Sequence, residues 1–442
     1  MKLSISSSAS FVLILLLMSV TQVLGQEVIL KSVDEAITMA LARNKDYDNY
    51  LLEQQKAQQE YKQARSHRFP TISGTFSGQR NLDLATTPLP GEIFGEPGQT
   101  IDAQFGQAYT YNAGISISKD LFNRQAALNA RISGLNRDLK AIEKEVFEEL
   151  LQEQVILYYY TGLVANRAKA IGEQDLESAI NLVQLSTQKY EEGLIDAITL
   201  NTAKINENAV RQNLISSEQL ALQCEIELKK LLGMQSSDPL VFNETLEYQT
   251  PQAYFVQQLR ADPILESAGL QLRQAEMNTQ LSKSSLLPVL SVNSYYGRQQ
   301  FRDDFGLSFS GDNWNNYSYL SLGLSVPIFT GFNNKSKIKQ SQIGQQMAFN
   351  SKQEVENSAI LNDQRLIADY EFSRRDAQKA LETYELYQEN LTLTLAQYEE
   401  GIIGLDHYLN VFEEYLKAEN AYLNATSKMY THYSQIIPRV SS

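Results

Sequence analysis

The chain has 442 residues, with 38 Lys and Arg against 52 Asp and Glu, and it contains one Cys and three His. The formal charge of -14 excludes a protein that wraps nucleic acid, because such binding needs clustered cations that displace counterions from the phosphates. A single Cys excludes an internal disulfide framework and a paired-cysteine zinc site. The hydrophobic fraction of 43% is sufficient for a packed fold.

Residues 1–25 have the pattern of a secretory signal peptide. One charge, Lys2, precedes an apolar run at 11–18, and Gly25 ends the segment before Gln26. This run is too short to span a bilayer, and no other stretch approaches the roughly 18 consecutive apolar residues of a transmembrane helix. We therefore predict an exported chain that could enter a membrane only as a β-barrel.

Two long tracts, at 98–238 and 328–437, contain no proline, which predicts helix over most of their extent. A proline inside a helix costs about 3 kcal/mol, and both tracts are rich in good helix formers. We expect each tract to form two long helices joined at a glycine. A helix over 123–190 would be on the order of 100 Å long.

A seven-residue repeat in the second tract predicts coiled-coil packing. The repeat consists of Tyr370, Ala377, Tyr384, Leu391 and Tyr398, and it resumes after the glycine turn as Tyr408, Tyr415 and Tyr422. We interpret these tyrosines as packing residues rather than as a ligand site.

Four segments with a period of two predict β-strands, arranged in two hairpins at about 70–119 and 288–327 with turn-rich loops. Around Ile115 and Leu322, apolar residues alternate with small polar ones. Aromatic residues near the loop ends suit an interfacial girdle; they are Tyr295, Tyr296, Phe301, Phe305 and Trp314.

The two halves of the chain resemble each other. The segment from Tyr190 to Ile195 matches that from Tyr398 to Ile403. Each half reads as helix, hairpin, long helix, glycine turn and long helix. We predict a signal peptide at 1–25, a first repeat at 26–232, a linker at 233–263 and a second repeat at 264–437.

The predicted strands suit an outer-membrane barrel but are too few to close one. Strands of roughly nine to eleven residues span such a membrane. Four strands cannot close, since the smallest of these barrels have about eight, and an open edge in lipid leaves backbone groups unpaired. Several chains must therefore contribute to one barrel, with the small polar faces lining a wet lumen.

Together with the tandem repeat, the strand exit Val326-Pro327-Ile328-Phe329 and the paired Tyr-Glu-Glu-Gly turns make the sequence resemble the TolC family of outer-membrane efflux proteins. The resemblance implies a mostly α fold in which long coiled-coil helices form a trimeric α-barrel. Two β-hairpins per chain would complete a twelve-stranded transmembrane β-barrel. The resemblance also implies an outer-membrane location in a Gram-negative bacterium, with a periplasmic helical tunnel.

The same resemblance implies a passive exit duct for a tripartite efflux or type I secretion system. Its partners would be two further copies in a homotrimer, a periplasmic adaptor (membrane fusion protein), an inner-membrane pump or ABC exporter, and outer-membrane lipid. No enzymatic activity, cofactor or nucleic acid is implied.

The two glycine turns are the candidate functional sites. In related proteins such turns meet the adaptor, which implicates Gly193, Leu194, Gly401 and Ile402 in docking. A helix C-cap explains a lone glycine equally well. Recurrence in both repeats, each time before Leu or Ile, favours docking.

Acidic residues crowd the same turns and indicate a negatively charged pore entrance, although exposed helix faces often carry such charges. The candidate entrance residues are Glu191, Glu192, Asp196, Glu399, Glu400, Asp406, His407 and Asn410. The family often places aspartates where this chain has His407 and Asn410. Because histidine titrates near neutral pH, a ring of His407 would make the entrance pH-sensitive.

We predict no catalytic or metal site elsewhere. His67 and His432 have no second ligand at metal spacing, and Cys224 lies among apolar residues as a small core residue would. The alternative to a duct is a secreted or periplasmic coiled-coil scaffold. The apolar strand faces argue against it, since they would be exposed to water.

Overall fold

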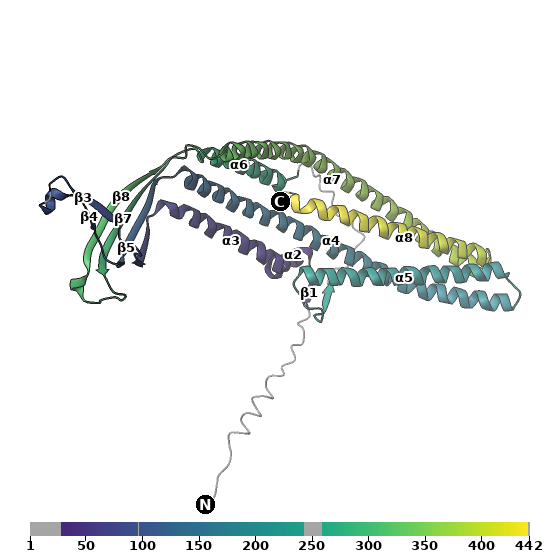
Figure 1. The fold of residues 1–442 in the computed structure, drawn as a ribbon. Helices are drawn as coiled ribbons and strands as arrows, with labels where there is room; N and C mark the ends of the chain where they lie inside the picture. The colour runs from purple at the N-terminus through teal and green to yellow at the C-terminus, as the bar shows by residue number, and fades with distance from the viewer. Residues whose placement is uncertain (1–27, 96, 243–258, 441–442) are drawn as a thin grey trace, which may run out of the picture. The chain divides into compact units, whose positions relative to one another are not determined.

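The computed structural model describes residues 28–95, 97–242 and 259–440 (Figure 1). The predicted signal peptide and residues 243–258 of the predicted linker lie outside the described residues. The chain divides into two compact units. The strand unit comprises residues 53–141 and 266–354, and the helical unit takes its residues from 1–52, 142–265 and 355–442. Each unit draws on both halves of the chain, and the repeat boundaries stay predictions.

A four-stranded antiparallel sheet, in the order β2-β5-β7-β8, forms the centre of the strand unit. Its strands are β2 (Thr71–Arg80), β5 (Tyr109–Phe122), β7 (Val289–Arg302) and β8 (Asn315–Ser325). The two expected hairpins are β2 with β5 and β7 with β8. Pairing of β5 with β7 joins them into one sheet.

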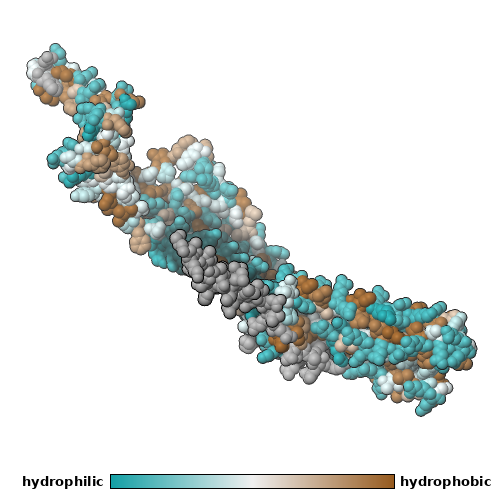
Figure 2. All heavy atoms as spheres, turned by 90° about the horizontal axis from the view of Figure 1, so that it is seen from below, coloured by the Kyte–Doolittle hydropathy of each residue, from teal (hydrophilic) through white to brown (hydrophobic). Residues whose placement is uncertain are grey.

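This sheet has an apolar face and a polar face, as the alternation in the sequence predicts. Ile117 lies opposite Ile72, and Ile115 lies opposite Tyr296. These side chains and Leu322 of β8 are exposed, and Figure 2 shows hydrophobic residues at the surface of the molecule. Small polar residues such as serine and threonine alternate with them and therefore occupy the other face.

The strand register corrects the expectation of a single aromatic girdle. Tyr295 and Tyr296 are neighbours in β7, so they point to opposite faces of the sheet. Tyr296 lies opposite Ile115 on the apolar face, whereas Tyr295 lies opposite Ser116 on the polar face. Phe301, six residues after Tyr295, shares the polar face. A girdle in contact with lipid needs its rings on one face of the sheet. Of the three girdle residues that lie in β7, only Tyr296 is on the apolar face.

A small ribbon within the first hairpin loop was not expected from the sequence. It pairs β3 (Thr86–Pro90) with β4 (Thr100–Gln104) in an antiparallel arrangement. The sequence predicts only a turn-rich loop here, and Pro88 and Pro90 cannot donate to a strand ladder. In a two-stranded ribbon each strand has a free edge where no donor is needed, so proline is tolerated there.

The long helices follow the proline pattern. The helix α4 (Arg124–Glu191) has 68 residues, and α7 (Asn333–Glu399) has 67. Each is followed across a glycine turn by another helix, α5 (Ala197–Leu231) and α8 (Leu405–Ile436), respectively. The predicted helix at 123–190 is confirmed to within one residue at each end.

Shorter elements complete the two units. They are the helices α2 (Val33–Arg43), α3 (Lys45–Arg65) and α6 (Pro263–Ser284), and the parallel pair β1 (Val28–Leu30) and β6 (Leu240–Phe242). Pro263 begins α6, where its missing N–H costs no helical hydrogen bond. Within the described ranges, no helix is both long and apolar enough to cross a membrane.

The predicted heptad residues lie in the core of the helical unit. Tyr384 of α7 is fully buried, and its ring stacks on Tyr422 of α8 with centroids 5.5 Å apart. Tyr415 of α8 lies 5.7 Å from the same ring. Tyr370 and Tyr408 are buried as well. These tyrosines are packing residues, as their spacing predicts.

Candidate functional site

The turn between α4 and α5 is a Schellman motif built around Gly193. This glycine has a φ of 72°, and its N–H donates to the Tyr190 carbonyl at 3.0 Å. The Leu194 N–H donates to the Lys189 carbonyl at 2.8 Å. Both bonds satisfy carbonyls at the end of α4, and glycine adopts the left-handed conformation without steric cost.

The turn between α7 and α8 has the same geometry. Gly401 has a φ of 73°, and its N–H donates to the Tyr398 carbonyl at 3.0 Å. The Ile402 N–H donates to the Gln397 carbonyl at 2.9 Å. Helix capping therefore accounts for both turn glycines. Of the two roles considered for them, capping and adaptor docking, capping is the simpler.

Capping does not account for the residue that follows each glycine. An apolar side chain in this position often packs back on the last helical turn. Leu194 and Ile402 instead each expose 65% of their surface. The same exposed apolar side chain thus stands at the same point of two matching turns.

The two turns belong to one packed end of the helical unit (Figure 1). The Lys189 ammonium lies 5.6 Å from the ring centroid of Tyr398, and that ring stacks on Tyr408 at 5.9 Å. Behind the turns, the buried Asn206 side chain of α5 donates to the Leu409 carbonyl of α8 at 3.0 Å. Leu194 and Ile402 are therefore exposed at the end of a well-packed group of helices.

All eight candidate entrance residues are exposed. They are Glu191, Glu192, Asp196, Glu399, Glu400, Asp406, His407 and Asn410. Asp196 caps the start of α5, where it accepts bonds from the Thr199 N–H and hydroxyl at 2.8 Å each. These bonds lower the pKa of Asp196. Helix capping is enough to explain an aspartate at position 196. A role of the eight residues at a pore entrance stays a prediction.

A buried pair of acids lies deeper in the helical unit, and our sequence reasoning missed it. Asp175 of α4 and Glu419 of α8 are both more than nine-tenths buried. The Tyr415 hydroxyl donates to Asp175 Oδ1 at 3.4 Å. Burial raises the pKa of both acids, and the bond to Asp175 and its charge help raise the pKa of Glu419 to about 9. The pair therefore retains a proton at neutral pH.

The acid pair lines a cavity of about 160 Å³ between α4, α5 and α8. The other polar groups of its lining are amides and hydroxyls, from Asn213, Ser216, Ser217, Asn420, Asn424 and Ser427. The cavity has room for several waters at roughly 30 Å³ each. A sequence signal existed, because Glu419 stands on the buried stripe of α8 between Tyr415 and Tyr422, where an acid is unusual.

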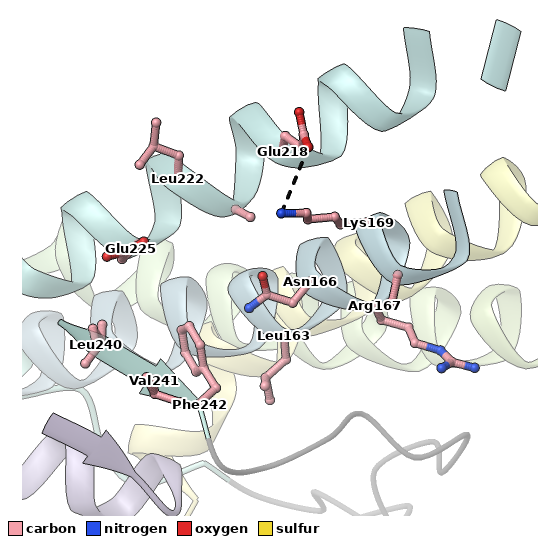
Figure 3. A pocket seen from close by; sticks show the side chains of 12 residues that line it. Leu163, Asn166, Arg167, Lys169, Glu218, Leu222, Glu225, Leu240, Val241 and Phe242 are labelled. Carbon is pink, nitrogen blue, oxygen red and sulfur yellow. Dashed lines mark ion pairs between the residues drawn. The ribbon is translucent and has the colours of Figure 1, made fainter. Parts of the chain in front are cut away.

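A larger cavity, of about 600 Å³, lies between α4, α5 and β6 (Figure 3). Leu163, Leu222 and Phe242 supply apolar lining. Lys169 pairs with Glu218 at 3.9 Å, an exposed contact that contributes little. Among the described residues, its lining contains no serine, cysteine or histidine, so it lacks the hydroxyl, thiol and imidazole groups of the commonest nucleophile–base pairs.

The remaining sequence candidates have local roles. Cys224 is buried in α5, and burial raises its pKa to about 11, so it is a core residue rather than a nucleophile. His67 Nδ1 lies 2.8 Å from the Ala64 carbonyl at the end of α3. In the part of the chain that the structure describes, no three His, Cys, Asp or Glu side chains gather to hold a metal ion.

The described residues thus combine long helices, two β-hairpins joined in one sheet and two matching glycine turns. A sequence model described as outer membrane efflux protein matches residues 36–234 and 255–437. The chain therefore belongs to the outer membrane efflux protein family. This membership confirms the resemblance seen in the sequence, and with it the expectation of an efflux protein rather than an enzyme.

Individual relatives agree with the family match. The probable efflux pump outer membrane protein TtgC of Pseudomonas putida is 22% identical over 320 residues, which cover 71% of this chain and 62% of that protein. The chain thus spans about three fifths of the length of the curated relatives that it matches.

Solved structures share the fold at low identity. A membrane protein from Pseudomonas aeruginosa matches with a TM-score of 0.76 and 17% identity, covering 92% of this chain and 89% of that one. The CmeC outer membrane channel of Campylobacter jejuni matches with a TM-score of 0.73 and 17% identity, covering 92% and 85%. The predicted mostly helical fold with β-hairpins is confirmed.

We expect Glu419→Gln to change how stability depends on pH. The pKa of Glu419 is raised from its ordinary 4.5 to about 9. Between these values the folded chain binds a proton that the unfolded chain has released, so this group makes stability fall as pH rises. Glutamine can still donate a hydrogen bond and cannot ionise.

Thermal melts followed by circular dichroism would test this expectation. The variant should melt several degrees above the wild type near pH 8.5 and close to it near pH 4.5. Glu414→Gln, an exposed change on the same helix, is the control and should not show this pH dependence. An equal shift of the Glu419 variant at both pH values would contradict the expectation.

Proposed function

We propose that the chain is the passive exit duct of a tripartite efflux system in the outer membrane of a Gram-negative bacterium, and that it acts as a homotrimer. The observation that carries the proposal is the four-stranded sheet. Among the described residues, its outer strands β2 and β8 each pair on one side only. In lipid each unpaired backbone group costs several kcal/mol, so these edges need partner strands.

Three copies would supply twelve strands, enough to close a barrel that four strands cannot close. The exposed apolar face, which includes Ile115 and Leu322, would then contact lipid. The small polar face would line a water-filled lumen. In a secreted scaffold the same apolar face would stand in water, which disfavours that alternative.

Exposed apolar residues on two helices support the assembly of several copies. They are Ile198, Ile205, Ile215 and Leu222 on α5, and Phe372, Leu386 and Leu393 on α7. Spacings of seven or fourteen residues recur within both sets, as expected where a further helix packs alongside. We infer that neighbouring copies cover these residues and that the long helices of the copies together form a periplasmic tunnel.

The energy for transport must come from partners, since the duct performs no chemistry. We infer that a periplasmic adaptor docks at Gly193, Leu194, Gly401 and Ile402, and that an inner-membrane pump or ABC exporter drives the cargo. The exposed Leu194 and Ile402 support this docking. The relatives TtgC and ArpC, which are named as outer membrane proteins of efflux pumps, support an efflux role.

Oligomeric mass and conductance test the duct directly. Protein purified from outer membranes in detergent should have the mass of a homotrimer, and in planar bilayers it should give discrete conductance steps. The apolar sheet face should also keep it insoluble without detergent. A water-soluble monomer without conductance would overturn the proposal in favour of the scaffold.

Docking at the turns predicts a separation of efflux from conductance. The double change Leu194→Asp and Ile402→Asp should abolish efflux in cells, because it places charge on the apolar contact, while purified channels keep their conductance. The matched control, Glu192→Gln, alters the first turn but leaves its apolar side chain. Full efflux in the double variant would exclude docking through these two residues.

A pH-sensitive entrance predicts that conductance changes between about pH 5.5 and 8, the range in which histidine titrates. His407→Gln should remove this dependence, and His432→Gln should retain it. Conductance of the wild type that is constant over this range would rule out the His407 ring.

A further inference from the structure

Three tyrosines form a cluster on the polar face of the sheet. Tyr295 of β7 lies directly opposite Tyr319 of β8, and Tyr317 lies opposite Gly297. The ring of Tyr295 stacks on Tyr319 at 5.8 Å and lies 5.7 Å from Tyr317. Tyr317 and Tyr319 are 5.8 Å apart, edge to face. All three belong to the strand unit and share one side of one hairpin.

A pair of glycines forms the floor beneath this cluster. Gly114 of β5 lies opposite Gly297 of β7. A Cβ on Gly114 would lie 2.8 Å from Cζ of Tyr295, and one on Gly297 would lie 2.8 Å from its hydroxyl. Backbone atoms across the β5–β7 ladder would lie nearer still, at 2.7 Å or less from each Cβ, so neither position can carry a side chain. The Tyr295 ring rests on the bare backbone of two strands.

The three rings differ in exposure: Tyr295 is held in place against the glycines, whereas Tyr317 and Tyr319 remain accessible. Tyr295 is only 8% exposed, and its buried hydroxyl has no hydrogen-bond partner. Tyr317 and Tyr319, whose rings contact the Tyr295 ring, remain 42% and 47% exposed. A buried tyrosine usually pairs its hydroxyl. We read Tyr295 as a support that holds the other two rings outward.

The wall around the cluster is polar and nearly free of charge. In the four strands of the sheet, Asp120 near the end of β5 is the one charged residue whose place in the alternation puts it on this face. The remaining residues are mainly Ser, Thr, Asn, Gln and Gly. Apart from the rings, this wall has little to attract one class of solute over another.

We propose that Tyr317 and Tyr319 are a contact site on the wall of the duct for organic cations, in particular those with quaternary or aromatic groups. The inference rests on the proposed function, because the polar face lines a passage only when several copies close the barrel. A ring face attracts a weakly hydrated cation through its quadrupole and stacks on an aromatic group. Symmetry would repeat the site in each copy at one level of the lumen.

Block of the channel current by tetraphenylphosphonium tests the site. The purified trimer is placed in planar bilayers, and the concentration of the probe that halves the conductance is measured. In the double variant Tyr317→Leu and Tyr319→Leu this concentration should rise about fivefold, since two weak ring contacts are lost. The double change to Phe keeps both ring faces and should leave the concentration near the wild-type value.

Tyr296 provides the matched control because it is the same residue type one position from Tyr295. It is exposed on the apolar face, so Tyr296→Leu should leave the block unchanged. If the leucine double variant does not assemble, the single changes Tyr317→Thr and Tyr319→Thr carry the same test, since threonine is common on this face. Each should weaken the block about twofold.

The outcomes separate this inference from the proposed function. Normal conductance with a block that is indifferent to Tyr317 and Tyr319 overturns the contact site and leaves the duct intact. A block that is weakened by Tyr296→Leu instead overturns the assignment of faces. Absence of any wild-type conductance overturns the duct, and the contact site with it.

Discussion

The ladder between β5 and β7 is the interaction on which the strand unit depends. It joins hairpins from the two halves of the chain and runs from Tyr109 opposite Arg302 to Phe122 opposite Leu290, with one irregularity after Asp120. Because side chains alternate along a strand, this register also determines which residues of β2 and β8 share a face. It makes the apolar face continuous, and it brings Gly114 against Gly297.

The helical unit depends on burial of tyrosine at heptad positions. Tyrosine fills more of a helical interface than leucine. Its hydroxyl, however, costs folding free energy when it is buried without a hydrogen bond. Tyr415 donates to Asp175, and Glu419 adds a second acid with no cation in the cavity lining. The proton retained by the acid pair removes the charge repulsion that would otherwise separate α8 from α4.

The two turns show how one local motif can leave a surface for a partner. Capping by Gly193 and Gly401 ends the long helices in the same way, and both following side chains point outward. Leu194 and Ile402 could be identified in the sequence because the turn repeats. Their exposure could not, since the same residue often covers the end of its own helix. Asp196 belongs to the same turns, and the structure gives it a capping role that the sequence reasoning did not consider.

The sequence by itself determined the long helices, the buried tyrosine stripe, the two hairpins and the family, because proline placement and periodicity are properties of neighbours along the chain. It could not bring Tyr295 against Gly114, pair β5 with β7 or bring Asp175 to Glu419. The β3–β4 ribbon could not be predicted either, since its prolines are compatible with both a turn and a free strand edge. Only the tertiary structure decided these features, because each depends on the register or packing of segments that are distant in the chain.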